Sequence, residues 1–178
     1  MLTLLTLTSF AAPPVVDAVD STGTWGTTTI ATDPHTLMSL LTDPNELTEV
    51  IRVGRVLATT PDGVCTKDTM WMAQGAGSSV FTVRTCPTTA GQHSSLVESS
   101  DLVMYEADWK LTPVADGTEV TYSLAMKSPY DDSGVSMSTA TREAVGDSLH
   151  YLERHFRPAP IAPAKPLESE VTAALAVD

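Results

Sequence analysis

Basic side chains are scarce in this sequence, and no Lys or Arg occurs before Arg52. The 178 residues contain ten Lys and Arg against 22 Asp and Glu, which gives a formal net charge of -12. The ten basic residues form no cluster, and a basic patch is what attracts nucleic acid and anionic membrane surfaces. We therefore expect neither of these as a direct partner.

Short motifs of enzymes and metal sites are also missing. The sequence contains no G-x-S-x-G, no P-loop and no H-E-x-x-H. The four histidines do not converge on a metal site, and the last two, His150 and His155, are too far apart to share one helix face. We predict no metal, no cofactor and no catalytic residue.

Long apolar runs are missing too. The first residues, MLTLLTLTSFAAPP, form a run too short to span a bilayer but typical of a secretory signal peptide, with cleavage near Ala11 or Ala12. No Lys or Arg precedes the run, and the alternative is a disordered or strand-forming N-terminus. We expect residues 1–21 to be a signal peptide and linker, and the protein to be secreted or periplasmic.

Cysteine occurs only twice, and the two residues flank a predicted hairpin, CTKDTMWMAQGAGSSVFTVRTC. With Gly75-Ala76 at the centre, Cys65 and Cys86 lie directly opposite each other, a geometry that accepts a disulfide. Such a bond persists in an oxidising compartment, in agreement with export. The alternative is a pair of buried free thiols.

Residues 101–127 predict a second, longer hairpin, because apolar and polar residues alternate on both sides of Asp116-Gly117. With these two residues at the tip, Trp109 lies opposite Leu124, and both apolar rows share one face. A half-buried antiparallel sheet follows. The same register pairs Leu111 with Tyr122, Ala107 with Met126, and Glu106 with Lys127.

The order of elements indicates an α+β fold. A strand over residues 23–32 precedes two short helices that begin at Asp33-Pro34 and Asp43-Pro44, where Asp is a good N-cap. Six antiparallel strands and one long helix over residues 138–157 follow. One apolar sheet face and one long helix to cover it make two layers. Residues 158–178 are Pro- and Ala-rich and predict a mobile tail.

Residues 22–157 resemble the START-like, helix-grip superfamily, which includes Bet v 1-like proteins and bacterial polyketide cyclase-like (SRPBCC) domains. The resemblance rests on the helix pair, on the W-x-L-x-P-x-x-D-G-T pattern that starts at Trp109, and on the last helix ending LHYLERHF. It implies a seven-stranded curved antiparallel sheet wrapped around a long C-terminal helix, with two short helices after the first strand. It also implies a hydrophobic cavity between sheet and helix.

We expect this cavity to bind a hydrophobic small molecule or lipid, for carriage or sequestration by a monomer. Methionine side chains adapt to an apolar guest, although the same residues could fill an ordinary core. The residues predicted to contact the ligand are Met70, Met72, Phe81, Val83, Tyr105, Trp109, Tyr122, Met126, Leu149 and Leu152.

Asp68 is a polar residue on an otherwise apolar row, opposite Val83. If buried, its carboxylate could orient a ligand hydroxyl or act as a general acid or base, whereas near a strand end it would be solvated. The hydroxyls of Tyr105 and Tyr122 could bind a ligand or a protein partner. Two alternative functions stay open. One is a cyclase, dehydratase or hydrolase acting in the same cavity, and the other is a protein-interaction module that uses the tail.

Overall fold

The computed structural model describes residues 15–19, 23–51, 54–74, 77–130 and 135–157. Within them one antiparallel sheet has eight strands in the order β1-β2-β8-β7-β6-β5-β4-β3. The strands are β1 (Val15–Val19), β2 (Gly23–Ile30), β3 (Gly54–Asp62), β4 (Cys65–Gln74), β5 (Gly77–Thr88), β6 (Gly91–Ser99), β7 (Met104–Val114) and β8 (Gly117–Lys127). The helices are α1 (Pro34–Thr42), α2 (Pro44–Val50) and α3 (Val135–His155).

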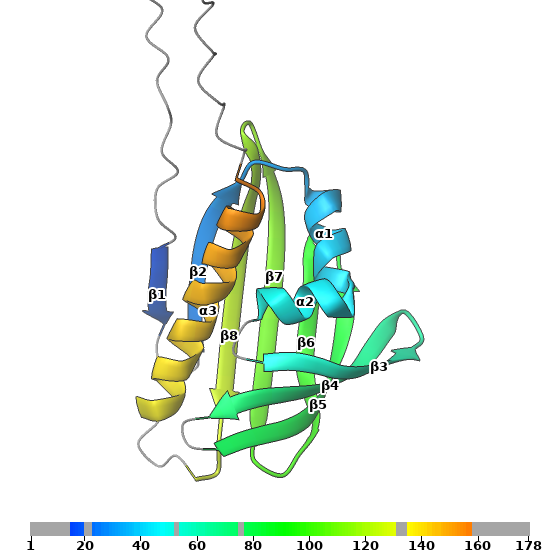
Figure 1. The fold of residues 1–178 in the computed structure, drawn as a ribbon, viewed down its shortest axis with the longest axis vertical. Helices are drawn as coiled ribbons and strands as arrows, with labels where there is room; N and C mark the ends of the chain where they lie inside the picture. The colour runs from blue at the N-terminus through cyan, green and yellow to red at the C-terminus, as the bar shows by residue number, and fades with distance from the viewer. Residues whose placement is uncertain (1–14, 20–22, 52–53, 75–76, 131–134, 158–178) are drawn as a thin grey trace, which may run out of the picture.

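The predicted helix-grip architecture is confirmed, with one strand more than expected. The sheet curves around α3, which packs on β2 and β8, while α1 and α2 lie toward the β3 side (Figure 1). The eighth strand is β1, formed by residues that the sequence analysis assigned to a linker. It pairs antiparallel with β2, with Val15 opposite Thr27 and Val19 opposite Gly23. At five residues, this strand is too short to stand out as an alternating pattern.

An aspartate caps the N-terminus of each helix of the short pair, as predicted. The Asp33 carboxylate accepts hydrogen bonds from the backbone N–H groups of His35 and Thr36, both at 3.0 Å. Asp43 ends α1 and caps α2, where its carboxylate accepts the N–H of Asn45 at 2.9 Å. Because one residue serves both helices, the chain changes direction with no loop between them.

The register predicted for the β7–β8 hairpin is wrong by two residues. Trp109 pairs with Tyr122 instead of Leu124, and the tip is Ala115-Asp116. Gly117 is the first residue of β8, where its φ of 139° and its approach to β2 both require glycine. A Cβ there would lie 2.1 Å from the Ile30 carbonyl oxygen. A shift of two residues keeps every side chain on its face, so the apolar face was predicted correctly. The other expected pairs become Leu111 with Val120, Ala107 with Leu124, Glu106 with Ala125, and Met104 with Lys127.

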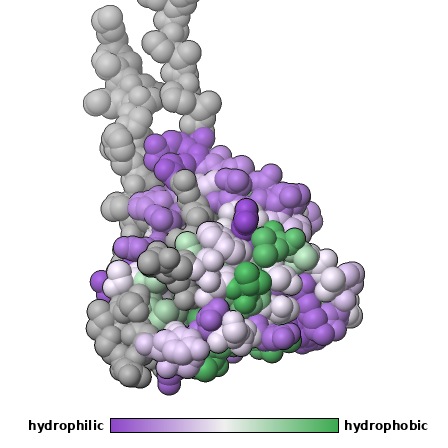
Figure 2. All heavy atoms as spheres, turned by 60° about the horizontal axis from the view of Figure 1, so that its bottom comes forward, coloured by the Kyte–Doolittle hydropathy of each residue, from purple (hydrophilic) through white to green (hydrophobic). Residues whose placement is uncertain are grey.

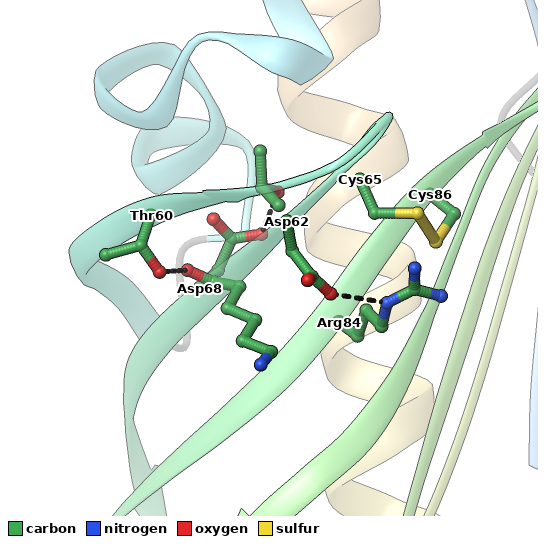
Figure 3. Close-up of polar contacts among 8 residues, drawn as sticks. Thr60, Asp62, Cys65, Asp68, Arg84 and Cys86 are labelled. Atoms are coloured by element: carbon green, nitrogen blue, oxygen red, sulfur yellow. Dashed lines mark hydrogen bonds and ion pairs between the residues drawn. A yellow bond between two sulfur atoms is a disulfide. The ribbon is translucent and has the colours of Figure 1, made fainter.

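The register of the β4–β5 hairpin agrees with the prediction, and so does the disulfide. Met70 pairs with Phe81 and Asp68 with Val83. Cys65 and Cys86 are joined, with their Cα atoms 4.3 Å apart (Figure 3). The bond therefore fixes the register of the two strands where β4 begins.

The core lies between the inner face of the sheet and the helices. Helix α3 contributes Val145, Leu149 and Leu152, all fully buried, and the sheet faces them with residues such as Val120 and Tyr122. The helix starts three residues before the predicted position and ends at His155. None of the described helices is long and apolar enough to cross a bilayer.

Removal of the disulfide should destabilise the fold strongly. The bond closes a loop with a sequence separation of 21 residues. Closure of such a loop restricts the unfolded chain and stabilises by about 3 kcal/mol. We expect the Cys65→Ser/Cys86→Ser double variant to lose about that much free energy of unfolding in urea. The wild type in excess reductant should behave as the double variant does, and equal stability of oxidised and reduced wild type would contradict the prediction.

Candidate ligand-binding pocket

A pocket of about 160 Å³ lies between the helix pair and one half of the sheet. Helices α1 and α2 form one wall, and strands β3 to β6 form the other. Apolar side chains predominate on the helix wall, where Thr42 is the polar exception, and hydroxyls, an amide and a carboxylate make up much of the sheet wall. The apolar group includes Met38, Leu41, Leu47 and Val56, and the polar group is Thr42, Thr59, Thr66, Asp68, Thr85 and Gln92.

Asp68 is the charged residue of this pocket. Asp68 is only 6% exposed. The alternative of a carboxylate solvated near a strand end is therefore wrong. The Thr59 hydroxyl donates to Oδ1 at 2.8 Å, and the Thr66 hydroxyl donates to Oδ2 at 2.9 Å. No Lys, Arg or His among the described residues forms an ion pair with it. Asp68 is therefore a carboxylate held by two neutral donors.

The alternation of β4 places this carboxylate inside the fold. Asp68, Met70 and Met72 point inward and are buried. Trp71 points to the outer face, where the Arg55 guanidinium carbon lies 5.2 Å from its ring centroid. The outer face of this part of the sheet also carries an ion pair between Arg84 Nε and Asp62 Oδ2 at 2.7 Å (Figure 3). Asp62 and Asp68 therefore differ in their surroundings although they lie on adjacent strands.

Two tyrosines add polar groups to the interior. Burial raises the pKa of the Tyr105 hydroxyl above its usual range, and the negative charge of Asp68 raises it further, against the opposing effect of a hydrogen bond from Tyr122. Burial also raises the pKa of Tyr122, and the neighbouring Tyr105 adds to this. Both hydroxyls are thus neutral hydrogen-bonding groups at physiological pH.

The structure gathers the ten predicted ligand residues into one core but not around this pocket. All ten are buried, and none of them lines the pocket. Two of them, Trp109 and Tyr122, stack with ring centroids 3.8 Å apart. Their role as ligand contacts stays a prediction. Asp68 is the predicted site residue that the pocket contains.

Sequence reasoning missed the helix side of the pocket. A short helix beginning at Asp33-Pro34 was predicted, but none of its residues was predicted to contact a ligand, whereas Met38 and Leu41 line the pocket. Thr59 and Thr66 carry no distinctive signal in a threonine-rich chain. The role of Thr59 depends on the pairing of β3 with β4, which sets it opposite Asp68. Thr66 precedes Asp68 by two residues on β4, so alternation alone puts both on one face.

One buried hydroxyl in α3 has no hydrogen-bond partner. Ser148 is 1% exposed, and its Oγ meets neither a donor nor an acceptor. It lies between Val145 and Leu149, residues of the buried stripe of the same helix. Serine hydroxyls in helices are usually solvated or bonded to the backbone. Ser148 therefore places an unsatisfied hydroxyl on the buried face of α3.

Histidines and surface apolar residues form no further candidate site in the described part of the chain. His93 lies on the surface, with Nε2 3.0 Å from Glu106 Oε2 and Nδ1 2.8 Å from Asp108 Oδ1. No group of three His, Cys, Asp or Glu residues in the described ranges could hold a metal ion. Figure 2 shows apolar residues, in green, in small groups among hydrophilic ones. The large exposed apolar residues of the described chain are Leu57, Val64, Val80, Val97, Val103, Val114 and Tyr130.

Comparison with known proteins shows the fold and no closer relationship. No family model matches the sequence, and no curated protein does either. Among solved structures, TTHA0849 from Thermus thermophilus has 18% identity and a TM-score of 0.61, over 74% of this chain and 94% of its own. A START superfamily protein from Mycobacterium smegmatis has 15% identity and a TM-score of 0.61, over 76% and 97%.

The similarity extends to one half of a larger protein. The di-domain ARO/CYC StfQ from the steffimycin biosynthetic pathway has 10% identity and a TM-score of 0.56, over 74% of this chain and 49% of its own. The protein therefore has the START/Bet v 1-like helix-grip fold. At these identities, the likeness says nothing of its ligand.

The raised tyrosine pKa values should make stability fall at alkaline pH. The folded state keeps both hydroxyls neutral, whereas the unfolded chain ionises them near the ordinary pKa of 10.0. Stability from this source is complete below pH 10 and declines above it, with a slope of up to about 1.4 kcal/mol per pH unit for each tyrosine. We expect the Tyr105→Phe/Tyr122→Phe variant to show a shallower decline in urea denaturation at about pH 9 to 11. Identical slopes in variant and wild type would refute this.

Removal of the unpartnered hydroxyl should stabilise the protein. We expect Ser148→Ala to raise the free energy of unfolding by about 1 kcal/mol or more, because an unsatisfied buried hydroxyl is lost and alanine is a better helix former. Ser39→Ala is the control, because it makes the same substitution at an exposed position of α1. Its hydroxyl has a partner, since it donates to the His35 carbonyl oxygen at 3.0 Å, and the substitution removes that hydrogen bond. A decrease for Ser148→Ala, measured by thermal unfolding, would mean that the hydroxyl has a stabilising role.

Proposed function

We propose that the protein binds a hydrophobic small molecule or lipid between its sheet and its helices, for carriage or sequestration. The observation that supports this best is the pocket of about 160 Å³, in which Met38, Leu41 and Leu47 face the polar wall of the sheet. Transfer of apolar surface from water stabilises a complex by about 25 cal/mol per Å² of buried area. An apolar cavity of similar size, about 150 Å³, accepts a molecule such as benzene.

A larger guest would extend from this pocket into the core. Asp68 lines the pocket and lies on the same inward row as Met70 and Met72, so β4 runs from one region into the other. Methionine side chains can change shape at low cost because they are unbranched. The ten predicted ligand residues are therefore our proposal for the deeper part of the site. The two helices that cover the pocket would move to admit such a guest.

The proposal also includes that the protein is exported and acts as a monomer. The disulfide indicates a non-cytoplasmic environment, because such bonds persist where thiols are oxidised. The predicted signal sequence lies outside the described residues. So does the tail of residues 158–178, and the alternative of an interaction module that uses this tail stays open.

A second candidate function is an enzyme that acts on an apolar substrate in the same interior. The observation that favours it is the set of Asp68, Tyr105 and Tyr122, which supplies a carboxylate and two neutral hydroxyls on one buried face. Asp68 would then be the group that takes a proton. The fold that the chain shares with an ARO/CYC protein agrees with this alternative.

A larger side chain that fills part of the pocket tests the binding proposal. Leu47 lines the pocket, whereas Leu57 lies on β3 outside it and is 47% exposed. We expect benzyl alcohol to give saturable amide shifts in NMR titrations of the wild type. Leu47→Trp should weaken this binding about tenfold, because the larger ring occupies the space, and Leu57→Trp should leave it unchanged. Absence of saturation, or equal affinity in both variants, would contradict the proposal.

A further inference from the structure

The pocket presents hydrogen-bond acceptors at the position of Asp68. The Thr59 and Thr66 hydroxyls each have one proton, and both donate it to the Asp68 carboxylate. A hydroxyl that has used its proton offers only lone pairs to a third group. The Gln92 side-chain amide uses one of its two Nε2 protons in a hydrogen bond to the Leu41 carbonyl oxygen at 3.4 Å.

The Asp68 carboxylate can accept further hydrogen bonds. A carboxylate accepts about four hydrogen bonds, and each Asp68 oxygen receives one from a threonine. Asp68 has no ion-pair partner within the described part of the chain, although it is buried. A buried charge is costly unless an opposite charge compensates it. Thr59 and Thr66 supply hydrogen bonds to this carboxylate but no opposite charge.

We propose that the pocket beneath α1 and α2 selects a small apolar molecule that carries a primary ammonium group. An ammonium has three donors and no acceptor, which complements a wall of acceptors around a carboxylate. The apolar body of the ligand would contact Met38, Leu41 and Leu47 on the helix wall. A carboxylate ligand would be repelled by Asp68 and by the net charge of -12. This inference rests on the proposed binding function and names the chemical class of the ligand.

Three probes of one shape test the selection by charge. Benzylamine, benzyl alcohol and benzoate have the same ring and differ in the polar group, which is cationic, neutral and anionic near neutral pH. We expect NMR titration of the full chain to rank them in that order, with benzylamine binding at least about tenfold more tightly than benzyl alcohol.

Substitution of the carboxylate should abolish the preference for the amine. Asp68→Asn keeps the shape of the side chain and removes its charge, so benzylamine should lose about tenfold in affinity while benzyl alcohol changes less than about twofold. Asp62→Asn is the matched control, because it removes one carboxylate from the outer face of the same sheet edge. It should leave the order of the three probes unchanged.

The possible results separate this inference from the function on which it rests. Benzyl alcohol that binds as well as benzylamine in the wild type overturns the amine selectivity and leaves the binding function in place. Failure of all three probes to bind overturns both. Equal loss of benzylamine affinity in Asp62→Asn and Asp68→Asn would assign the effect to net charge and overturn the role of Asp68. If Asp68→Asn does not fold, the wild-type ranking of the probes decides the matter.

Discussion

The rest of the structure depends on the way α3 packs on the sheet. The helix covers β2 and β8, where Val145, Leu149 and Leu152 are completely buried. The far side of the same sheet, from β6 to β3, needs another cover for its inward side chains. Helices α1 and α2 supply that cover at one end, and they are short and joined at a single residue, Asp43. A pocket is left where two short helices meet a wide sheet.

The polar residues of the interior follow from the same division of the sheet. Around α3 the buried polar side chains pair across to β2, since the Thr24 and Thr141 hydroxyls lie 3.1 Å apart and the Thr28 hydroxyl donates to Glu153. The Ser148 hydroxyl is the one buried side-chain polar atom of the described residues that lacks a hydrogen-bond partner. Toward β3 the inward rows carry Asp68 and hydroxyls that satisfy it. A carboxylate is tolerated there because threonines on β3 and β4 donate to it, and the pocket lies beside it. The half of the fold that α3 does not cover therefore contains both the buried carboxylate and the pocket.

The sequence was sufficient for features that depend on neighbours along the chain. Alternation revealed the inner and outer faces of β4, β5, β7 and β8, and two cysteines placed symmetrically about a turn fixed one register. The other register failed because Gly117 was assigned to the tip, whereas it is needed beside Ile30 of a distant strand. The pocket was missed for the same reason. Its walls come from residues 38–92, and only the folded sheet places Thr59 and Asp68 opposite each other beneath a helix.

The chemistry of the buried side chains limits which catalytic roles each of them could have. Acid–base catalysis requires a group poised near the working pH to give or take a proton. Tyr105 and Tyr122 have raised pKa values and stay neutral, so they can donate hydrogen bonds but cannot act as bases at neutral pH. Asp68 accepts one hydrogen bond on each carboxylate oxygen, from the hydroxyls of Thr59 and Thr66. A carboxylate held in this way keeps lone pairs for a further donor, and this is the basis of the proposed selectivity for an ammonium group.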